Sequence, residues 1–241
     1  MEQLSKQQTG TAIGGTIGAV LGNQFGGNNK VMWTTFGALG GALLGNQIGK
    51  FLDERDQQRM VQVTEQTIAT GQTHTWSNPE NNTRGEARVI ATETKQEPVK
   101  VKVLKKKISK VPPLDIIGQT YRATTNSNLR GGPGTDYVVV GNLTENEIVN
   151  VVGKVRDKDW YLISHDGVGS GFIHTPLLEA APTEAPTPPE TPIAESDVGE
   201  EHVAANRVCR KIEQSVSLAN GSSHTETIDA CQGPTGWEVQ A

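Results

Sequence analysis

The chain has 241 residues, of which 34% are hydrophobic, 5% aromatic and 20% charged, and it contains 27 glycines and 12 prolines. Ordinary chains carry about 45–50% apolar residues on a count that includes glycine, so this composition argues against one large core and predicts small modules joined by linkers. A net charge of −5 argues against a generally basic nucleic-acid binder, and no nucleic-acid partner is expected.

Glycines near the N-terminus recur at intervals of four, which is one face of a helix. They are Gly10, Gly14, Gly18, Gly22, Gly26, Gly37, Gly41, Gly45 and Gly49. The stretch is almost uncharged, and residues 14–26 and 37–49 share eight identities in thirteen positions. A helix this rich in glycine is disfavoured in water, whereas in a bilayer small residues let two helices approach closely. With a turn at residues 26–30, the pattern predicts a transmembrane α-hairpin; the alternative is a flexible Gly/Ala-rich segment.

Further motifs carry a family resemblance. Gly71-Gln72, Trp76-Ser77-Asn78-Pro79 and Gly85 follow the glycine repeat, and the C-terminal segment contains Val208-Cys209-Arg210, Gly221, Ala230-Cys231 and Gly236-Trp237. Together with the glycine repeat they resemble the 17-kilodalton surface-antigen lipoproteins of bacterial outer membranes. The resemblance implies an outer-membrane or periplasmic location and a small β domain that the motifs build.

The segment between these motifs resembles a second family. Leu129-Arg130-Gly131-Gly132-Pro133-Gly134, a valine run at residues 138–140, Trp160-Tyr161 and Gly171-Phe172-Ile173 are similar to the bacterial SH3-like barrel. Short runs rich in β-branched and aromatic residues independently favour a small all-β domain. The resemblance implies a groove for cell-wall peptides, with Arg130 beside it and Tyr137, Trp160 and Phe172 as aromatic walls. Trp160 and Phe172 could instead belong to the barrel core, and Arg130 could fix the turn.

Two segments of opposite charge flank this barrel. Residues 95–110 carry seven lysines that alternate in part with Val99, Val101 and Val103, as in a strand with one wet face. This segment is either a lysine-guarded edge strand or a surface that attracts anionic lipid or glycan. Residues 180–201 hold five prolines and six acidic residues, which is typical of a semi-rigid disordered spacer.

Cys209 and Cys231 are the two cysteines, and the turn at Asn220-Gly221 lies between them. A hairpin would bring them together, and in an oxidising periplasm we expect one disulfide, worth about 3 kcal/mol in the chain-entropy model. Two free thiols are the alternative. The five histidines are isolated in the sequence and no nucleotide or metalloprotease motif is present, so we expect no catalytic residues, no metal and no cofactor, and hence no enzyme.

The predicted fold class is multidomain: a glycine-zipper transmembrane α-hairpin, a small all-β domain and an SH3-like β-barrel. The predicted divisions are an N-terminal tail (1–9), the helical hairpin (10–62), the first half of the surface-antigen-like β domain (63–97), a Lys-rich linker or edge strand (98–114), the barrel (115–179), a Pro/acidic linker (180–201) and the second half of the β domain (202–241).

These features predict a non-enzymatic envelope protein that is anchored in the outer membrane and binds peptidoglycan through the barrel, as a tether or scaffold. The expected partners are membrane, cell-wall peptide and further copies of the chain through the hairpin. The alternative is a zipper-driven oligomer that forms a pore or a ring in an envelope assembly; a third is an adaptor whose zipper packs on itself. Met1-Glu2-Gln3-Leu4 is neither a signal peptide nor a lipobox. We expect either that the sequence begins after a removed signal peptide or that the true start lies upstream; the alternative is a protein that is not a lipoprotein. We assign no acylation site.

Overall fold

The computed structural model describes residues 43–45, 47–189 and 191–240, and they are mostly β-strand. Their single α-helix is α3 (Glu54–Thr70), and none of the helices in the described ranges is long and apolar enough to cross a membrane. The predicted fold class is therefore wrong in its helical hairpin. Seven of the nine zipper glycines, Gly10, Gly14, Gly18, Gly22, Gly26, Gly37 and Gly41, lie outside the described residues.

The last two zipper glycines show why the helical interpretation fails at its C-terminal end. Gly45 lies against the carboxylate of Glu226, where a Cβ would overlap that side chain, and Gly49 belongs to the short 3-10 helix η1 (Ile48–Phe51). The Glu226 carboxylate accepts hydrogen bonds from the backbone N–H groups of Gln47 and Ile48, at 3.1 and 3.2 Å. The backbone here is thus held by a β-strand side chain, and at Gly45 and Gly49 the interval of four does not mark an α-helix face.

Helix α3 has well-defined ends. The Asp53 carboxylate accepts a hydrogen bond from the Asp56 backbone N–H at 2.9 Å, which caps the N-terminus. Gly71 ends the helix in the left-handed conformation (φ 74°), and its N–H donates to the Thr67 carbonyl. Met60, Thr64 and other inward-facing side chains of α3 are buried.

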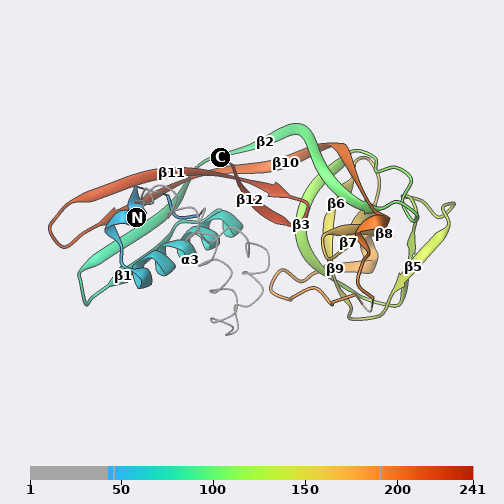
Figure 1. The fold of residues 1–241 in the computed structure, drawn as a ribbon, viewed down its shortest axis with the longest axis horizontal. Helices are drawn as coiled ribbons and strands as arrows, with labels where there is room; N and C mark the ends of the chain where they lie inside the picture. The colour runs from blue at the N-terminus through green and yellow to red at the C-terminus, as the bar shows by residue number, and fades with distance from the viewer. Residues whose placement is uncertain (1–42, 46, 190, 241) are drawn as a thin grey trace, which may run out of the picture.

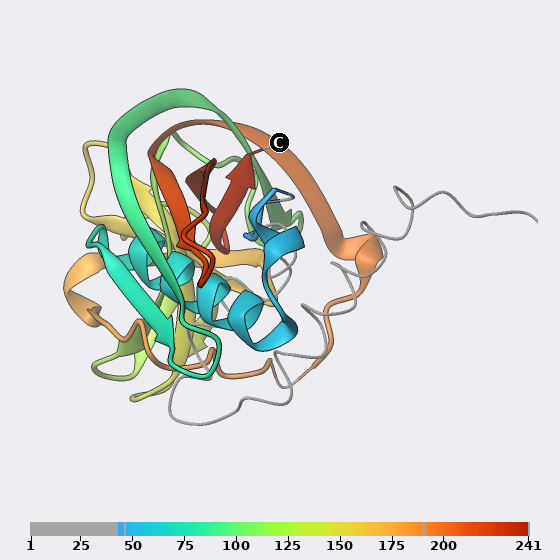
Figure 2. The ribbon, with the colours of Figure 1, turned by 90° about the vertical axis from the view of Figure 1, so that its left-hand side faces the viewer.

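Five antiparallel strands form the sheet that α3 covers on one face (Figures 1 and 2). In spatial order they are β1 (His74–Asn78), β2 (Thr83–Leu104), β10 (Val198–Ser217), β11 (Ser223–Gly233) and β12 (Gly236–Gln240). A sheet with an apolar face needs a covering layer, and the helix supplies it. The predicted small all-β domain therefore includes a helix.

Strands β2 and β10 are much longer than the rest of this sheet and extend to the second half of the molecule (Figure 1). They pair from Arg84 opposite Ser217 to Leu104 opposite Val198, with a bulge near Lys211. A strand as long as β10 spans roughly 65 Å at about 3.3 Å per residue. The ends of the lysine-rich and acidic segments thus lie side by side, and the Lys100 ammonium is 3.1 Å from the Glu200 carboxylate.

Seven shorter strands form the second half. They are β3 (Leu114–Ala123), β4 (Ser127–Arg130), β5 (Val139–Leu143), β6 (Ile148–Val155), β7 (Trp160–His165), β8 (Val168–His174) and β9 (Leu178–Ala180). The strands pair in the order β3-β6-β7-β8-β4-β5, and β9 pairs with β3. Two 3-10 helices, η2 (Thr175–Leu177) and η3 (Glu195–Asp197), lie in the return path to β10. Leu162, Ile163 and Ile173 are among the fully buried residues of this SH3-like unit.

The two halves touch at a second place besides the long strands. The turn between β11 and β12 lies on β3 and β6, where the Asn150 side-chain amide donates to the Pro234 carbonyl at 2.8 Å. Gly118 has φ +57°, and a Cβ on it would overlap the Gly233 carbonyl oxygen. Glycine is needed at position 118 for this close approach. One continuous sheet and this turn join the halves.

Candidate functional site

The loop between β4 and β5 borders the peptide groove that the SH3-like resemblance predicts. The Gly131 N–H donates to the Val138 carbonyl at 3.0 Å, which closes the loop. The Tyr137 ring lies on Gly132, and a Cβ at that glycine would overlap the ring. A guanidinium N–H of Arg130 donates to the Tyr137 carbonyl at 2.7 Å. Arg130 therefore helps to fix the turn, and no other hydrogen bond of its guanidinium is formed within the described residues.

The same loop exposes apolar side chains. Five large hydrophobic side chains of the described residues are exposed, and three of them are consecutive: Tyr137 (41%), Val138 (73%) and Val139 (52%). Lys158, in the turn between β6 and β7, donates to the Pro133 carbonyl at 3.2 Å. The surface formed by the loop and this turn thus combines apolar side chains with cations.

The two other predicted wall residues lie deeper. Trp160 is half-buried against the barrel core, with its ring 5.8 Å from that of His174. Phe172 pairs with Arg130 in the β8–β4 ladder, but its side chain is 0% exposed and belongs to the core. The structure thus brings Arg130 and Tyr137 together at the surface and places Phe172 beneath them.

Sequence reasoning missed Val138, Val139 and Lys158 as members of this surface. One signal could have found the valines, because residues 137–144 contain no charged side chain, which is unusual for an exposed strand and its flanks. Lys158 has no comparable signal, since a tertiary contact between two turns brings it to Pro133.

The barrel contains two other polar arrangements. His165 contacts the Ser170 hydroxyl (2.8 Å) and the Glu147 carboxylate (3.3 Å), but Ser170 is only 3% exposed and cannot reach a substrate. A shallow pocket of about 350 Å³ is lined by Asn126, Ser127, Asn128, Asn142, Leu143 and Thr144. It offers neutral hydrogen-bonding groups. Within the described ranges, no group of three or more His, Cys, Asp or Glu residues could hold a metal ion.

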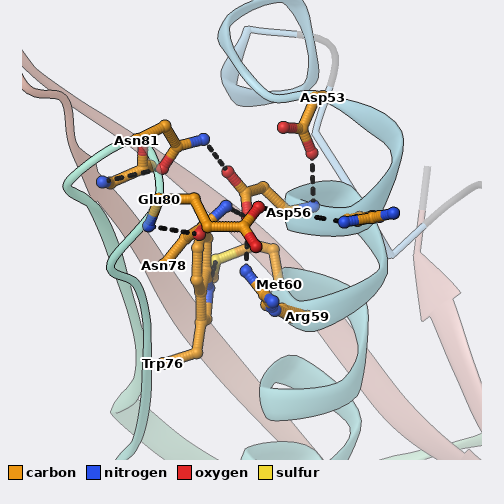
Figure 3. A network of polar contacts seen from close by, with 10 residues as sticks. Asp53, Asp56, Arg59, Met60, Trp76, Asn78, Glu80 and Asn81 are labelled. Carbon is orange, nitrogen blue, oxygen red and sulfur yellow. Dashed lines mark hydrogen bonds and ion pairs between the residues drawn. The ribbon is translucent and has the colours of Figure 1, made fainter.

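The Trp-x-Asn-Pro motif joins β1 to α3 (Figure 3). The Trp76 indole N–H points at the Met60 sulfur at 3.3 Å. A Cβ on Gly85, the β2 residue opposite Trp76, would overlap the indole ring. The motif's tryptophan and the following glycine are therefore a packing pair.

The asparagines of the same turn bind a buried carboxylate at the start of α3 (Figure 3). Asp56 is 1% exposed. Its two oxygens accept hydrogen bonds from the side-chain amides of Asn78 (2.9 Å) and Asn81 (2.7 Å) and from the Arg59 guanidinium (2.9 Å). Three donors satisfy the buried charge, as a stable buried carboxylate requires.

The remaining motif residues meet at the other end of α3. The Arg210 guanidinium donates to the Ile68 carbonyl in the last turn of α3, where a positive charge interacts favourably with the helix dipole. It lies 5.0 Å from the centre of the Trp237 ring and packs against Gly71. Cys209 and Cys231 are directly opposite each other in β10 and β11 and form the predicted disulfide. The surface-antigen-like motifs thus hold α3 on its sheet.

Helix α3 carries one buried acid. Glu65 is 2% exposed, and its Oε1 has no hydrogen-bond partner among the residues that the structure describes. Burial raises the pKa of this carboxyl from 4.5 to about 8. The folded protein therefore holds a proton that the unfolded chain has lost between these two pH values.

This proton makes stability depend on pH. Because the folded state binds more protons than the unfolded state, the free energy of unfolding falls as pH rises from about 4.5 to about 8. Glu65→Gln is expected to remove this fall and to raise stability at pH 8 by up to about 4 kcal/mol. Urea unfolding at pH 5 and pH 8 measures it, with the exposed Glu54→Gln as control. An unchanged pH dependence in Glu65→Gln would contradict the assignment.

Comparison with known families matches two segments of the chain. Residues 125–179 match the bacterial SH3 domain, and residues 9–49 match the glycine zipper 2TM domain. The chain thus combines a glycine-zipper segment with a bacterial SH3 domain, as the sequence motifs predicted. Neither description is that of an enzyme.

The particular relatives are surface antigens. Two curated relatives, each named 17 kDa surface antigen, come from Rickettsia bellii and its strain RML369-C; each is 44% identical over 87 residues, which are 34% of this chain and 54% of the relative. The resemblance predicted from the sequence is confirmed. The chain spans about half the length of the curated relatives it matches. No solved structure shows a significant match.

Proposed function

We propose that this protein is a non-enzymatic component of a bacterial cell envelope, in which the SH3-like barrel binds cell-wall peptide and residues 9–49 associate with a membrane. The domain matches and the surface-antigen relatives support the envelope role. The observation that carries the binding role is the exposed apolar loop at Tyr137, with Arg130 and Lys158 against it. Such loops on a rigid scaffold are common sites of recognition.

The architecture supports a tether. The β2–β10 pair and the turn at Pro234 join the barrel to the α3-covered sheet. That sheet also binds the backbone of Leu43, Gln47 and Ile48, near the end of the glycine repeat, through Gln214 and Glu226. A wall-binding surface and a membrane-associated segment would then be held at a set separation. Two weak attachments in one chain raise each other's effective concentration.

Co-sedimentation of the full-length protein with purified peptidoglycan tests the binding role. The wild type is expected to sediment with the wall material, and the double variant Arg130→Ala/Tyr137→Ala to bind about tenfold more weakly, since it loses a donor and an aromatic contact. Arg84→Ala, which removes an exposed arginine of β2, is the matched control. Circular dichroism verifies folding, and unchanged binding by the folded double variant would contradict the assignment.

A further inference from the structure

Strand β5 is an edge of the barrel. It is the last strand in the spatial order and, among the residues described, pairs with β4 alone. Figure 1 shows it at the end of the molecule away from α3. An unpaired edge presents backbone N–H and C=O groups that can pair with another extended chain.

An exposed edge of β2 is protected against pairing with another chain, whereas β5 is not. Between its contacts with β1 and β8, one edge of β2 has no pairing strand in the described part of the chain, and this stretch carries Lys95, Pro98, Lys100 and Lys102. Lysine and proline discourage edge-to-edge pairing. Residues 137–144 contain neither, and Val138 and Val139 are exposed. The β5 edge has the composition of a strand that receives a partner.

Three cations lie near β5 and the loop before it. The Lys107 ammonium lies 3.7 Å from the position that a Cβ would occupy on Gly141 of β5. The backbone carbonyl oxygen of Lys107 lies 2.8 Å from the position that a Cβ would occupy on Gly131. Arg130 and Lys158 contact the same loop at Tyr137 and Pro133.

Within the described ranges, Lys107, Arg130 and Lys158 have no carboxylate within 4.0 Å, whereas Lys106 is paired with Asp197 and Lys100 with Glu200. Unpaired cations beside an apolar edge favour an anionic partner with apolar side chains.

We infer that the β5 edge binds an extended peptide bearing free carboxylates, which pairs its backbone with β5 and directs its carboxylates to Lys107, Arg130 and Lys158. This inference rests on the proposed function and specifies the ligand class and the binding mode. Lys107 follows β2 and lies outside the matched SH3 domain at residues 125–179. The ligand site is therefore composite, and the barrel alone lacks one of its cations.

Binding of soluble stem peptides to the full-length chain tests the inference. The probes are cell-wall stem peptides with free carboxylates and the same peptides with the carboxylates amidated, followed by isothermal titration calorimetry. Lys107→Gln and the edge-blocking Val138→Asp are each expected to weaken binding of the free-carboxylate peptide by about five- to tenfold. Lys110→Gln, the matched loss of a nearby exposed lysine, is expected to change it less than twofold. Amidation is expected to weaken binding to the wild type and to abolish the difference between the wild type and Lys107→Gln.

The experiments distinguish failure of the edge-site inference from failure of the proposed function. If the wild type sediments with peptidoglycan but Lys107→Gln and Val138→Asp bind the free peptide as the wild type does, the edge site is wrong and the proposed function stands. If the wild type binds neither peptidoglycan nor peptide, both are wrong. If the variants instead lose binding to vesicles of anionic phospholipid with no change toward peptide, the edge contacts lipid and the peptide assignment is overturned.

Discussion

Phe172→Ala is expected to lower the free energy of unfolding by about 3–5 kcal/mol, the usual cost of removing a buried aromatic side chain. The ring is 0% exposed and packs with Leu162, Val155 and other core residues beneath the loop that carries Arg130. Phe172 lies in β8 between its ladder partners Arg130 of β4 and Leu162 of β7, so the sheet holds the backbone on both sides of it. Urea unfolding followed by circular dichroism measures the change.

Tyr137→Ala is the control for this prediction, because the Tyr137 ring is 41% exposed. Its replacement is expected to cost less than about 1 kcal/mol, as at most surface positions. A stable Phe172→Ala variant that loses only peptidoglycan binding would mean that the ring belongs to the ligand site. The pair of variants thus separates the core role from the groove role that the sequence left open.

Asp56→Ala is expected to destabilise the α3-covered sheet by about 3 kcal/mol. The substitution leaves the amides of Asn78 and Asn81 without their acceptor and removes their hydrogen bonds to the first turn of α3 (Figure 3). Asp56→Asn keeps the shape but places an amide among donors, so it is expected to be destabilising as well. Thermal unfolding of the full chain measures both variants.

Asp53→Ala is the matched control at the same helix end. It removes one capping hydrogen bond of 2.9 Å, for which a loss of about 1 kcal/mol is typical. Equal stability of Asp56→Ala and Asp53→Ala would mean that the buried carboxylate contributes no more than a cap. The interpretation of the Asn-Pro motif as a structural link would then be wrong.

The positions of the motifs separate structure from recognition in this protein. Four motif residues hold α3 against its sheet: Trp76, Gly85, Arg210 and Trp237. Three of the five exposed large hydrophobic side chains of the described residues lie instead at the β4–β5 loop, together with Arg130 and Lys158, at the other end of the molecule. This division is why the proposals for binding concern the barrel.

Several features of the candidate site could be predicted from local sequence. The Gly131–Gly134 run predicts a sharp loop after Arg130, and glycine is required there because Tyr137 and the Lys107 carbonyl approach the backbone closely. The surface position of Tyr137 could be proposed, but Lys107 and Lys158 could not, because turns distant in sequence bring them to the loop. Phe172 and Tyr137 have similar aromatic character in the sequence, and only the direction of each side chain separates core from surface.

The sequence by itself determined the features that depend on neighbouring residues: alternating valines and lysines in β2, turns at glycines and asparagines, the cysteine pair across a hairpin, and the two family resemblances. The tertiary structure decided what depends on contacts between distant residues. The glycines at 45 and 49 share their spacing with a helix face, yet Glu226, some 180 residues later, holds this backbone. Likewise, the lysine-rich and acidic segments could each be taken as linkers, because a strand's partner cannot be inferred from its own residues. Backbone hydrogen bonds between β2 and β10 join the end of the lysine-rich segment to the end of the acidic segment in one two-stranded ribbon. Local residue propensity does not contain such long-range pairing.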